Sequence, residues 1–293
     1  MTIDAAGALP IREAAGARRR RVRSRTSVND SLGHLVLIGL SIVCLFPVYW
    51  MIVSSLRPAN EIFETRLWPT SASLANYATA LNSIPIWRML LNTLFVSSVV
   101  TIIQLFTGLL AAYGFARWRF PFSRLFLPLI ALTWLAPFQV VMIPNYLLVA
   151  QLDLLDSITA LILPHFASAL CVVLLTQAMR SFPKEIIEAA RMDGARSWRI
   201  LWQVVAPNLR GSIASLAILI FISTWNEYFW PLLLSRTPEN SVIQIGIQMF
   251  MTQEGTLWGP LMAASTMASL PILALYVVLQ RQVIQSFMKS GLR

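Results

Sequence analysis

Long apolar runs separated by short polar segments dominate the chain from residue 35 onward. A bilayer core is crossed by roughly 20 apolar residues of α-helix. Six runs are long enough, and they cover residues 35–56, 89–113, 125–149, 158–179, 212–234 and 261–280. The pattern predicts an all-α, polytopic membrane protein with about six transmembrane helices.

Prolines interrupt several of these runs, and the third run contains Pro128, Pro137 and Pro144. Proline removes a backbone donor and kinks a helix, which a membrane bundle tolerates when its neighbours bond the freed carbonyl. We therefore expect the third span to break near Pro137 to Pro144 and to continue as a short helix on the outer surface.

The composition agrees with a membrane location, because 57% of the 293 residues are hydrophobic and only 12% are charged. In water, that much apolar surface would cause aggregation. Cys44 and Cys171 lie in apolar runs and are expected to be small buried side chains rather than a disulfide pair. His34 and His165 have no Cys or carboxylate at ligand spacing, so we expect no metal site.

The positions of Lys and Arg predict the orientation. If the N-terminus is cytoplasmic, 19 of the 23 basic residues fall on the cytoplasmic side. Only Arg57, Arg66, Arg88 and Arg236 fall on the other side. The formal net charge of +10 then reflects membrane topology, and nucleic acid is not expected as a partner. Both termini are expected to be cytoplasmic.

The chain divides into a tail and a membrane domain. Residues 1–33 form a basic cytoplasmic tail that we expect to be disordered and able to contact anionic lipid. Residues 34–290 form the transmembrane domain, with its longest cytoplasmic loop at residues 180–211. The outer segment at about 57–88 is either a contact surface for an external partner or a simple connector.

The loop at 180–211 is charged but patterned like two helices. Ser181, Pro183 and Glu185 form a plausible helix start. Gly194 can adopt a positive φ and end that helix in a tight turn.

A second helix is expected to follow, with Ser197 as its cap and Pro207 limiting its extent. Apolar residues lie at i, i+3, i+4 and i+7 of this helix: Trp198, Leu201, Trp202 and Val205. Two amphipathic helices with a glycine hinge suit docking into a groove of a cytoplasmic partner. The simpler alternative is that the loop is a solvated connector.

The segment "EAARMDGARSWRILWQVVAPNLR" resembles the EAA loop of ABC-transporter permease subunits. Glu188, Ala189, Ala190, Gly194 and Pro207 match that motif. Val204 stands for its isoleucine, and Ala206 departs from its leucine. With "SFPKEI" before it and "TWNEYFWPLLL" after it, the segment resembles the MalG-like members of the carbohydrate-uptake branch.

The resemblance covers about residues 35–290 and implies a permease subunit of an ATP-driven importer in a bacterial plasma (inner) membrane. The implied substrate is a sugar or sugar-like solute, delivered by an extracytoplasmic solute-binding protein. The implied partners also include a second, homologous permease and a dimer of ATPase subunits that docks on the EAA loop. The resemblance assigns ATPase coupling to the following loop residues: Glu188, Ala189, Ala190, Asp193, Gly194, Trp198, Trp202 and Pro207.

The chain carries no sequence for binding ATP itself. A P-loop needs G-x-x-x-x-G-K-[ST], whereas Lys184 and Lys289, the only lysines, follow proline and methionine. We therefore expect no cofactor on this chain, no catalytic residues, and ATP with Mg²⁺ in the partner ATPase.

Glu227 is the only carboxylate well inside a predicted span. A buried charge in a membrane is expensive, so Glu227 is a candidate for substrate contact or for a gate. Asn226, Trp225 and Tyr228 are its candidate companions. A structural network near the outer mouth, with aromatic residues as interface anchors, is the alternative.

Three other functions are alternatives to a sugar permease. Permeases for glycerol-phosphate-type solutes are closely similar and stay open as an alternative. An ion-coupled secondary carrier needs several intramembrane charged sites, and only Glu227 is available. A membrane enzyme needs a catalytic constellation in the spans, and none is present in the sequence.

Overall fold

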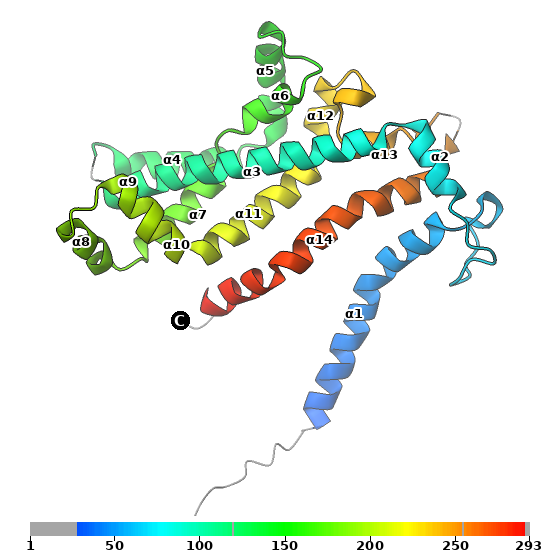
Figure 1. The fold of residues 1–293 in the computed structure, drawn as a ribbon, viewed down its shortest axis with the longest axis horizontal. Helices are drawn as coiled ribbons and strands as arrows, with labels where there is room; N and C mark the ends of the chain where they lie inside the picture. Colours follow the sequence, from blue (N-terminus) through cyan, green and yellow to red (C-terminus); the bar gives the residue numbers. More distant parts are fainter. Residues whose placement is uncertain (1–27, 119, 254, 291–293) are drawn as a thin grey trace, which may run out of the picture. The chain divides into compact units, whose positions relative to one another are not determined.

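The computed structural model describes residues 28–118, 120–253 and 255–290 (Figure 1). Most of the predicted tail, residues 1–33, lies outside the described residues. The chain divides into two compact units, Met1–Val48 and Tyr49–Arg293. The longer helices of the described part are α1 (Val28–Ser55), α3 (Ile86–Arg117), α4 (Ser123–Leu135), α5 (Phe138–Gln151), α7 (Ala169–Arg180), α11 (Arg210–Trp225) and α14 (Trp258–Ser290).

Short elements connect these helices. They are η1 (Ala59–Glu61), α2 (Ala75–Ser83), α6 (Ile158–Ile162), η2 (Leu163–His165), α8 (Lys184–Met192), α9 (Ser197–Ile200), η3 (Leu201–Val205), α10 (Ala206–Asn208), α12 (Phe229–Leu234), η4 (Pro238–Asn240) and α13 (Ile243–Gln248). A two-stranded antiparallel hairpin, β1 (Met251–Thr252) and β2 (Gly255–Thr256), precedes α14.

The described part of the first unit is the α1 segment up to Val48. Its side chains from Leu32 to Val48 are exposed, and most of them are apolar. Such a surface suits contact with lipid. Cys44 is exposed, contrary to the expected burial, because the described residues of its unit contain no second helix to pack against it.

The second unit is a helical bundle built around α3, which packs against α7 and α11, while α11 packs against α14. Figure 1 shows α3 running along the unit with α11 beside it. Val100 and Ala112 of α3 and Leu175 of α7 are fully buried in its main core. Gly108 permits this close approach, since a Cβ there would lie 2.6 Å from Sγ of Cys171 on α7. Small residues allow membrane helices to pack closely in this way.

The described residues contain three helices that can cross a membrane unbroken: Leu32–Ser55, Ile86–Arg117 and Trp258–Val278. Three further pairs of helices are bent at a short break, so up to six spans are present. This confirms the predicted fold class and the break in the third span, where α4 and α5 meet at 93°.

The predicted span at 212–234 is wrong in its limits. α11 ends at Trp225, and the bent pair to which it belongs begins at Ser197, with a bend of 81°. Pro231 explains the early end, because a proline in a helix interior clashes with the carbonyl four residues earlier, here that of Glu227. A separate short helix, α12, therefore starts at Phe229.

At the break between η2 and α7, side chains of α3 bond the freed backbone. Gln104 donates to the carbonyl of His165 at 2.9 Å, and Thr107 donates to the carbonyl of Phe166 at 2.9 Å. A backbone carbonyl without a partner costs several kcal/mol in a hydrocarbon environment. These two side chains therefore make the interruption of the helix tolerable.

Asp156, which adopts a left-handed backbone conformation with φ of 56°, joins the loop after α5 to the loop after α12. Its carboxylate accepts hydrogen bonds from the backbone of Arg236 and Thr237 at 2.8 and 3.0 Å and from the amide of Asn240 at 3.4 Å. Partial desolvation would raise the pKa of Asp156, but the hydrogen bonds outweigh it and hold that pKa below its ordinary value. The contact therefore stabilises the fold above the ordinary pKa and is lost as pH falls through the lowered one.

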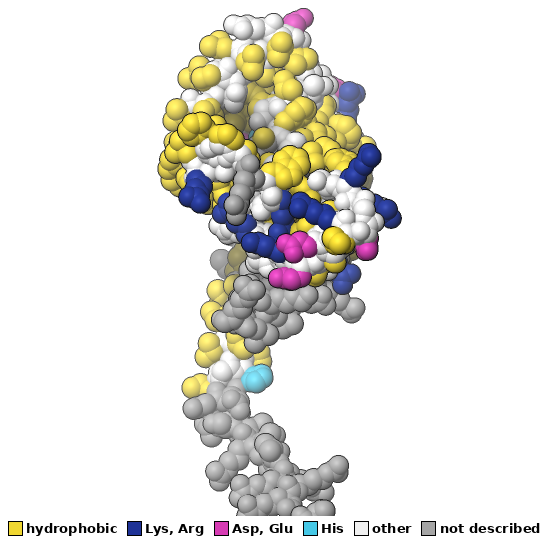
Figure 2. All heavy atoms as spheres, turned by 90° about the vertical axis from the view of Figure 1, so that its left-hand side faces the viewer, with side chains coloured by type: hydrophobic (Ala, Val, Ile, Leu, Met, Phe, Trp, Pro, Cys, Tyr) yellow, Lys and Arg dark blue, Asp and Glu magenta, His cyan; other side chains and the backbone are white. Residues whose placement is uncertain are grey.

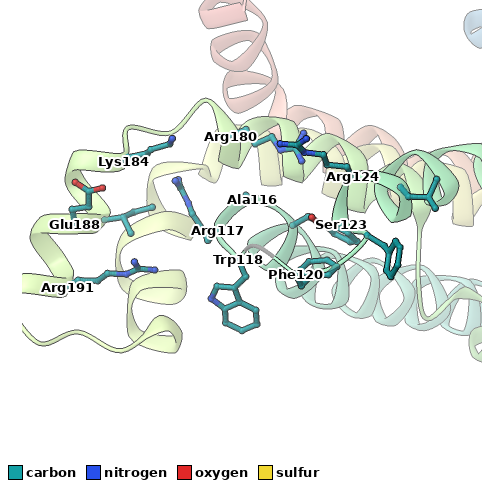
Figure 3. A pocket seen from close by; sticks show the side chains of 14 residues that line it. Ala116, Arg117, Trp118, Phe120, Ser123, Arg124, Arg180, Lys184, Glu188 and Arg191 are labelled. Atoms are coloured by element: carbon teal, nitrogen blue, oxygen red, sulfur yellow. The ribbon is translucent and has the colours of Figure 1, made fainter.

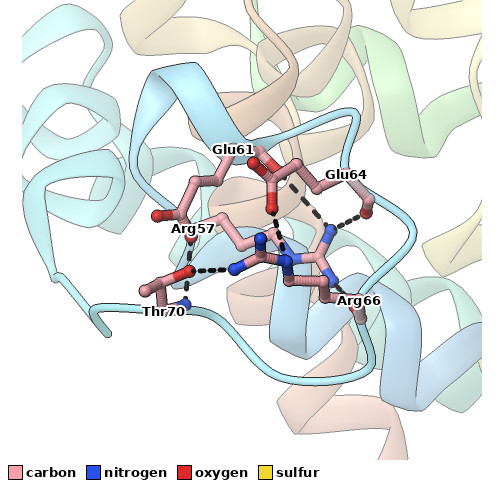
Figure 4. A network of polar contacts seen from close by, with 5 residues as sticks. All are labelled: Arg57, Glu61, Glu64, Arg66 and Thr70. Atoms are coloured by element: carbon pink, nitrogen blue, oxygen red, sulfur yellow. Dashed lines mark hydrogen bonds and ion pairs between the residues drawn. The ribbon is translucent and has the colours of Figure 1, made fainter.

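The segment after α1 is folded around Arg57, which is only 1% exposed (Figure 4). Its guanidinium donates to the carbonyls of Glu64 and Arg66, and it lies over the ring of Trp50 at 4.6 Å. Backbone N–H of Thr70 donates to Glu61 at 3.0 Å and closes the loop. This segment is therefore an ordered surface rather than a loose connector.

We predict that Arg57→Met makes the segment at 58–74 sensitive to protease and lowers the melting temperature of the purified protein. Each buried carbonyl left without its donor costs about 1–3 kcal/mol. The measurement is limited proteolysis with mapping of the cleavage sites, together with a thermal melt.

Arg66→Met is the matched control, because the Arg66 side chain is 66% exposed and its ion pair with Glu64 lies at the surface. An exposed ion pair contributes about 0–1 kcal/mol. Equal protease sensitivity of the two variants would contradict the structural role of Arg57.

Candidate functional site

The predicted helix–turn–helix at 180–211 is present, and its turn has a defined geometry. α8 ends at Met192, and Gly194 has a φ of +79°. The N–H of Gly194 donates to the carbonyl of Arg191 at 2.9 Å, and the N–H of Ala195 donates to that of Ala190 at 3.0 Å. These two bonds form a Schellman motif, which satisfies the last carbonyls of the helix. The predicted role of Gly194 in the backbone is therefore confirmed.

The helix starts differ in detail from the prediction. Pro183 is the N-cap of α8, whereas Ser181 ends α7 and donates to the carbonyl of Ala178 at 2.8 Å. Arg196, not Ser197, is the N-cap of α9. Neither helix has a side-chain cap, so packing rather than capping holds them.

The second helix is anchored to α3 through one of its two tryptophans. Trp202 stacks on Phe106 of α3 with ring centroids 5.8 Å apart, and Leu201 and Val205 are buried in the main core. Trp198 packs edge-on against Trp202 but is itself 61% exposed. In this chain, Trp202 holds the loop to the bundle, and Trp198 presents an apolar surface outward.

The second helix ends one residue after Pro207, so the predicted limit at this proline is confirmed to within one residue. Residues Leu201–Val205 form a π-helical turn, and the helix continues as α10 to Asn208. A π-turn changes which carbonyl lies opposite the proline ring, so it lets the helix pass Pro207. The chain then bends at Leu209 into α11.

The outward face of α8 is polar and accessible. Glu188, Ala189 and Asp193 are exposed, while Ala190 is half-buried against the core. Met192 is 89% exposed. Figure 2 shows charged side chains of both signs gathered at this end of the unit, beside hydrophobic ones. The loop therefore presents a rigid, mixed surface.

A second candidate site surrounds Glu227, in the break between α11 and α12. Glu227 is half-buried, and its Oε1 accepts the backbone N–H of Trp230 at 3.3 Å. It borders a cavity of about 470 Å³ that also receives His165, Ser168 and Thr224. Trp134 and Phe138 add aromatic walls to the same cavity. Such a mixture of aromatic and hydroxyl groups suits a polyhydroxylated solute.

Neither the hydrophobic periodicity nor a sequence motif indicates that His165 lines this cavity. It shares both the larger cavity and a small adjoining pocket with Glu227. Its Nδ1 lies 3.2 Å from the carbonyl of Leu161, and its ring lies against Phe138. An ionisable ring inside the predicted span 158–179 is the signal that points to it.

The three predicted companions of Glu227 differ in their burial and in their contacts. Trp225 is 1% exposed and stacks on Phe221 in the core, away from the cavity lining. Asn226 is exposed and bonds the carbonyl of Ile222 at 2.8 Å. Tyr228 is half-buried beside Phe229. Only Glu227 of the four lines the cavity in this chain.

Comparison with known proteins gives one family. Residues 104–289 match the family described as the binding-protein-dependent transport system inner membrane component. The chain belongs to this family. It is therefore a membrane-spanning permease subunit of an ABC importer, a transport protein and not an enzyme. Permeases of this family work with an ATPase and with a binding protein.

Relatives match along nearly the whole chain. The sn-glycerol-3-phosphate transport system permease protein UgpE of Yersinia pestis is 31% identical over 89% of this chain and 96% of the relative. The lactose transport system permease protein LacG of Rhizobium radiobacter is 27% identical over 91% of this chain and 97% of the relative.

The fold is also similar to a solved structure. It is the crystal structure of a bacterial ABC transporter involved in the import of the acidic polysaccharide alginate, with a TM-score of 0.75 and 27% identity. The similarity covers 88% of this chain and 98% of the solved one.

For this permease, we predict that Glu227→Gln lowers solute uptake while the assembled complex keeps its normal abundance. Glutamine keeps an oxygen that can accept the N–H of Trp230 and removes only the charge. The measurement is uptake by intact cells alongside the amount of complex purified from their membranes.

Glu227→Ala is the companion variant, because it removes both the charge and the hydrogen bond. Loss of complex with both variants would assign Glu227 to a structural network. Normal uptake by Glu227→Gln would exclude a role for its charge in transport.

Proposed function

We propose that this chain carries a sugar or sugar-like solute across the membrane through the cavity beside Glu227. The single observation behind this choice of solute is the lining of that cavity. Its described lining residues include hydroxyls and aromatic rings with Glu227 and His165, and they include no Lys or Arg. Aromatic faces and hydroxyls suit a neutral, polyhydroxylated solute.

A glycerol-phosphate-type solute is the second candidate, favoured by the identity to UgpE. Phosphate is usually bound through Arg or Lys, and a nearby carboxylate opposes it. The cavity of this chain would have to receive those cations from the second permease. For this reason we favour the neutral solute.

We further propose that the loop at 180–211 docks into an ATPase subunit, that the chain pairs with a second, homologous permease, and that a binding protein delivers the solute. ATP and Mg²⁺ then bind in the ATPase dimer. The rigid turn at Gly194, the exposed carboxylate of Glu188 and the exposed ring of Trp198 support docking through this surface. A large aromatic side chain is a common anchor at interfaces.

The proposed orientation puts this loop and both termini in the cytoplasm. In support, the ends of α3 and α7 and the loop itself carry Arg117, Arg180, Lys184 and Arg191. The opposite ends of the helices carry few basic residues, as the positive-inside rule expects.

We predict that cysteines introduced at Ser71 and Thr252, both exposed, react with a membrane-impermeant maleimide in intact cells. A cysteine at Ser197 should react only after the cells are permeabilised. The native Cys44 and Cys171 are replaced by Ala in all three chains. Labelling of Ser197→Cys in intact cells would reverse the proposed orientation.

We predict that Glu188→Lys and Gly194→Val each abolish transport while the spans stay folded. Lysine reverses a charge at the proposed interface, and valine opposes the positive φ by roughly 1–2 kcal/mol or more. The measurements are uptake, retention of the ATPase on the purified permease, and stimulation of ATP hydrolysis by the loaded binding protein.

Gly194→Asn is the matched control for the turn, because asparagine tolerates the left-handed conformation. It should keep most of the uptake that Gly194→Val loses. Normal uptake by both Glu188→Lys and Gly194→Val would make the loop a connector without a coupling role.

A further inference from the structure

A basic cavity of about 900 Å³ lies where the end of α3, the start of α4, the end of α7 and α8 meet. Figure 3 shows charged side chains lining it from several of these elements. Its basic lining residues are Arg117, Arg124, Arg180, Lys184 and Arg191. Glu188 is the only carboxylate among its described lining residues.

None of these cations forms an ion pair within the described part of the chain. The one ion pair within it joins Arg66 and Glu64, far along the chain from this cavity. Arg117 donates to the carbonyls of Met179 and Phe182 at 2.9 and 3.4 Å, but its Nε is buried without a hydrogen-bond partner. Positive charges gathered around one hollow repel one another unless an anion joins them.

The other wall of the cavity is apolar. Phe120, Phe122 and Leu125 contribute to this wall, and Phe122 is 72% exposed. Beyond the cavity, α4 exposes Leu129 and Leu132 along its length. A small soluble anion would make no favourable contact with this apolar wall. An amphiphile would contact the basic wall with its charged headgroup and the apolar wall with its hydrocarbon chains.

We propose that this cavity binds the phosphate-bearing headgroup of an anionic phospholipid, with its acyl chains along α4. Guanidinium groups bind phosphate oxygens through paired hydrogen bonds, and three arginines of the cavity are available on α3, α4 and α7. Basic pockets between transmembrane helices hold such headgroups at the membrane surface. The proposal rests on the membrane location of the family and not on the identity of the solute.

The bound headgroup connects the coupling loop to the bundle. Lys184 and Arg191 belong to α8, whereas Arg117 and Arg124 belong to α3 and α4. A phosphate between them joins α8 to both helices electrostatically. Anionic lipid therefore stiffens the base of the coupling loop.

The test uses the purified complete transporter, titrated with phosphatidylglycerol or with phosphatidylcholine, with bound lipid counted by native mass spectrometry. The wild type should bind phosphatidylglycerol in preference to phosphatidylcholine. Arg124→Gln/Arg180→Gln removes two cations of the cavity and should weaken its tightest phosphatidylglycerol binding about thirtyfold.

Arg196→Gln/Arg210→Gln is the matched control, with the same loss of charge at exposed positions outside the cavity lining. It should bind phosphatidylglycerol like the wild type. Equal binding by all three proteins would overturn the proposal.

Two further outcomes would also overturn it. If inorganic phosphate displaced the lipid at concentrations similar to those at which phosphatidylglycerol itself binds, the acyl chains would add nothing and the cavity would be a site for a free anion. Loss of the ATPase from Arg124→Gln/Arg180→Gln, with lipid binding unchanged, would instead make the cavity part of the ATPase interface.

Discussion

The bundle depends on one constraint: inside a bilayer, every interruption of a helix must find hydrogen-bond partners within the protein. Three of the spans in the described part are bent pairs, so this requirement recurs through the fold. α3 meets it at the break before α7. Gln104 and Thr107 bond the carbonyls at the break before α7, and Arg117 bonds the carbonyl of Met179 near its end. An unbroken helix with polar side chains on its buried face allows its neighbours to be broken.

The breaks between helices also determine where the titratable side chains of the cavity lie. A continuous fifth span would carry Glu227 on a helix face, but the break gives it a backbone N–H of Trp230 and a position at the cavity edge. The break before α7 likewise brings His165 to the same cavity. Both residues with a titratable side chain in this cavity therefore lie at interruptions, where a polar group can be bonded by backbone.

Much of the fold can be predicted from the sequence, because long apolar runs form helices and prolines break them through interactions between residues close together in the chain. The break at Pro137, the turn at Gly194 and the two loop helices follow from residues adjacent in the chain. Arg57 and His165 do not, because their roles depend on distant backbone and on cavities formed by several helices. The π-turn at 201–205 does not follow from the local sequence for a similar reason, because Leu201 and Val205 are held in the core formed by several helices.

α3 also connects the loop at 180–211 to the cavity beside Glu227. Phe106 stacks on Trp202 of the loop, and Gln104, less than one turn away, lines the cavity and bonds the carbonyl of His165. A displacement of the second loop helix therefore acts on the same turn of α3 that holds the broken span together. This contact alone does not establish energetic coupling between the loop and the cavity. Coupling also requires that the contact has two discrete arrangements that differ in free energy. The break beside His165 supplies a place for such a change, because its two helices are joined by hydrogen bonds from Gln104 and Thr107 rather than by a continuous helical backbone.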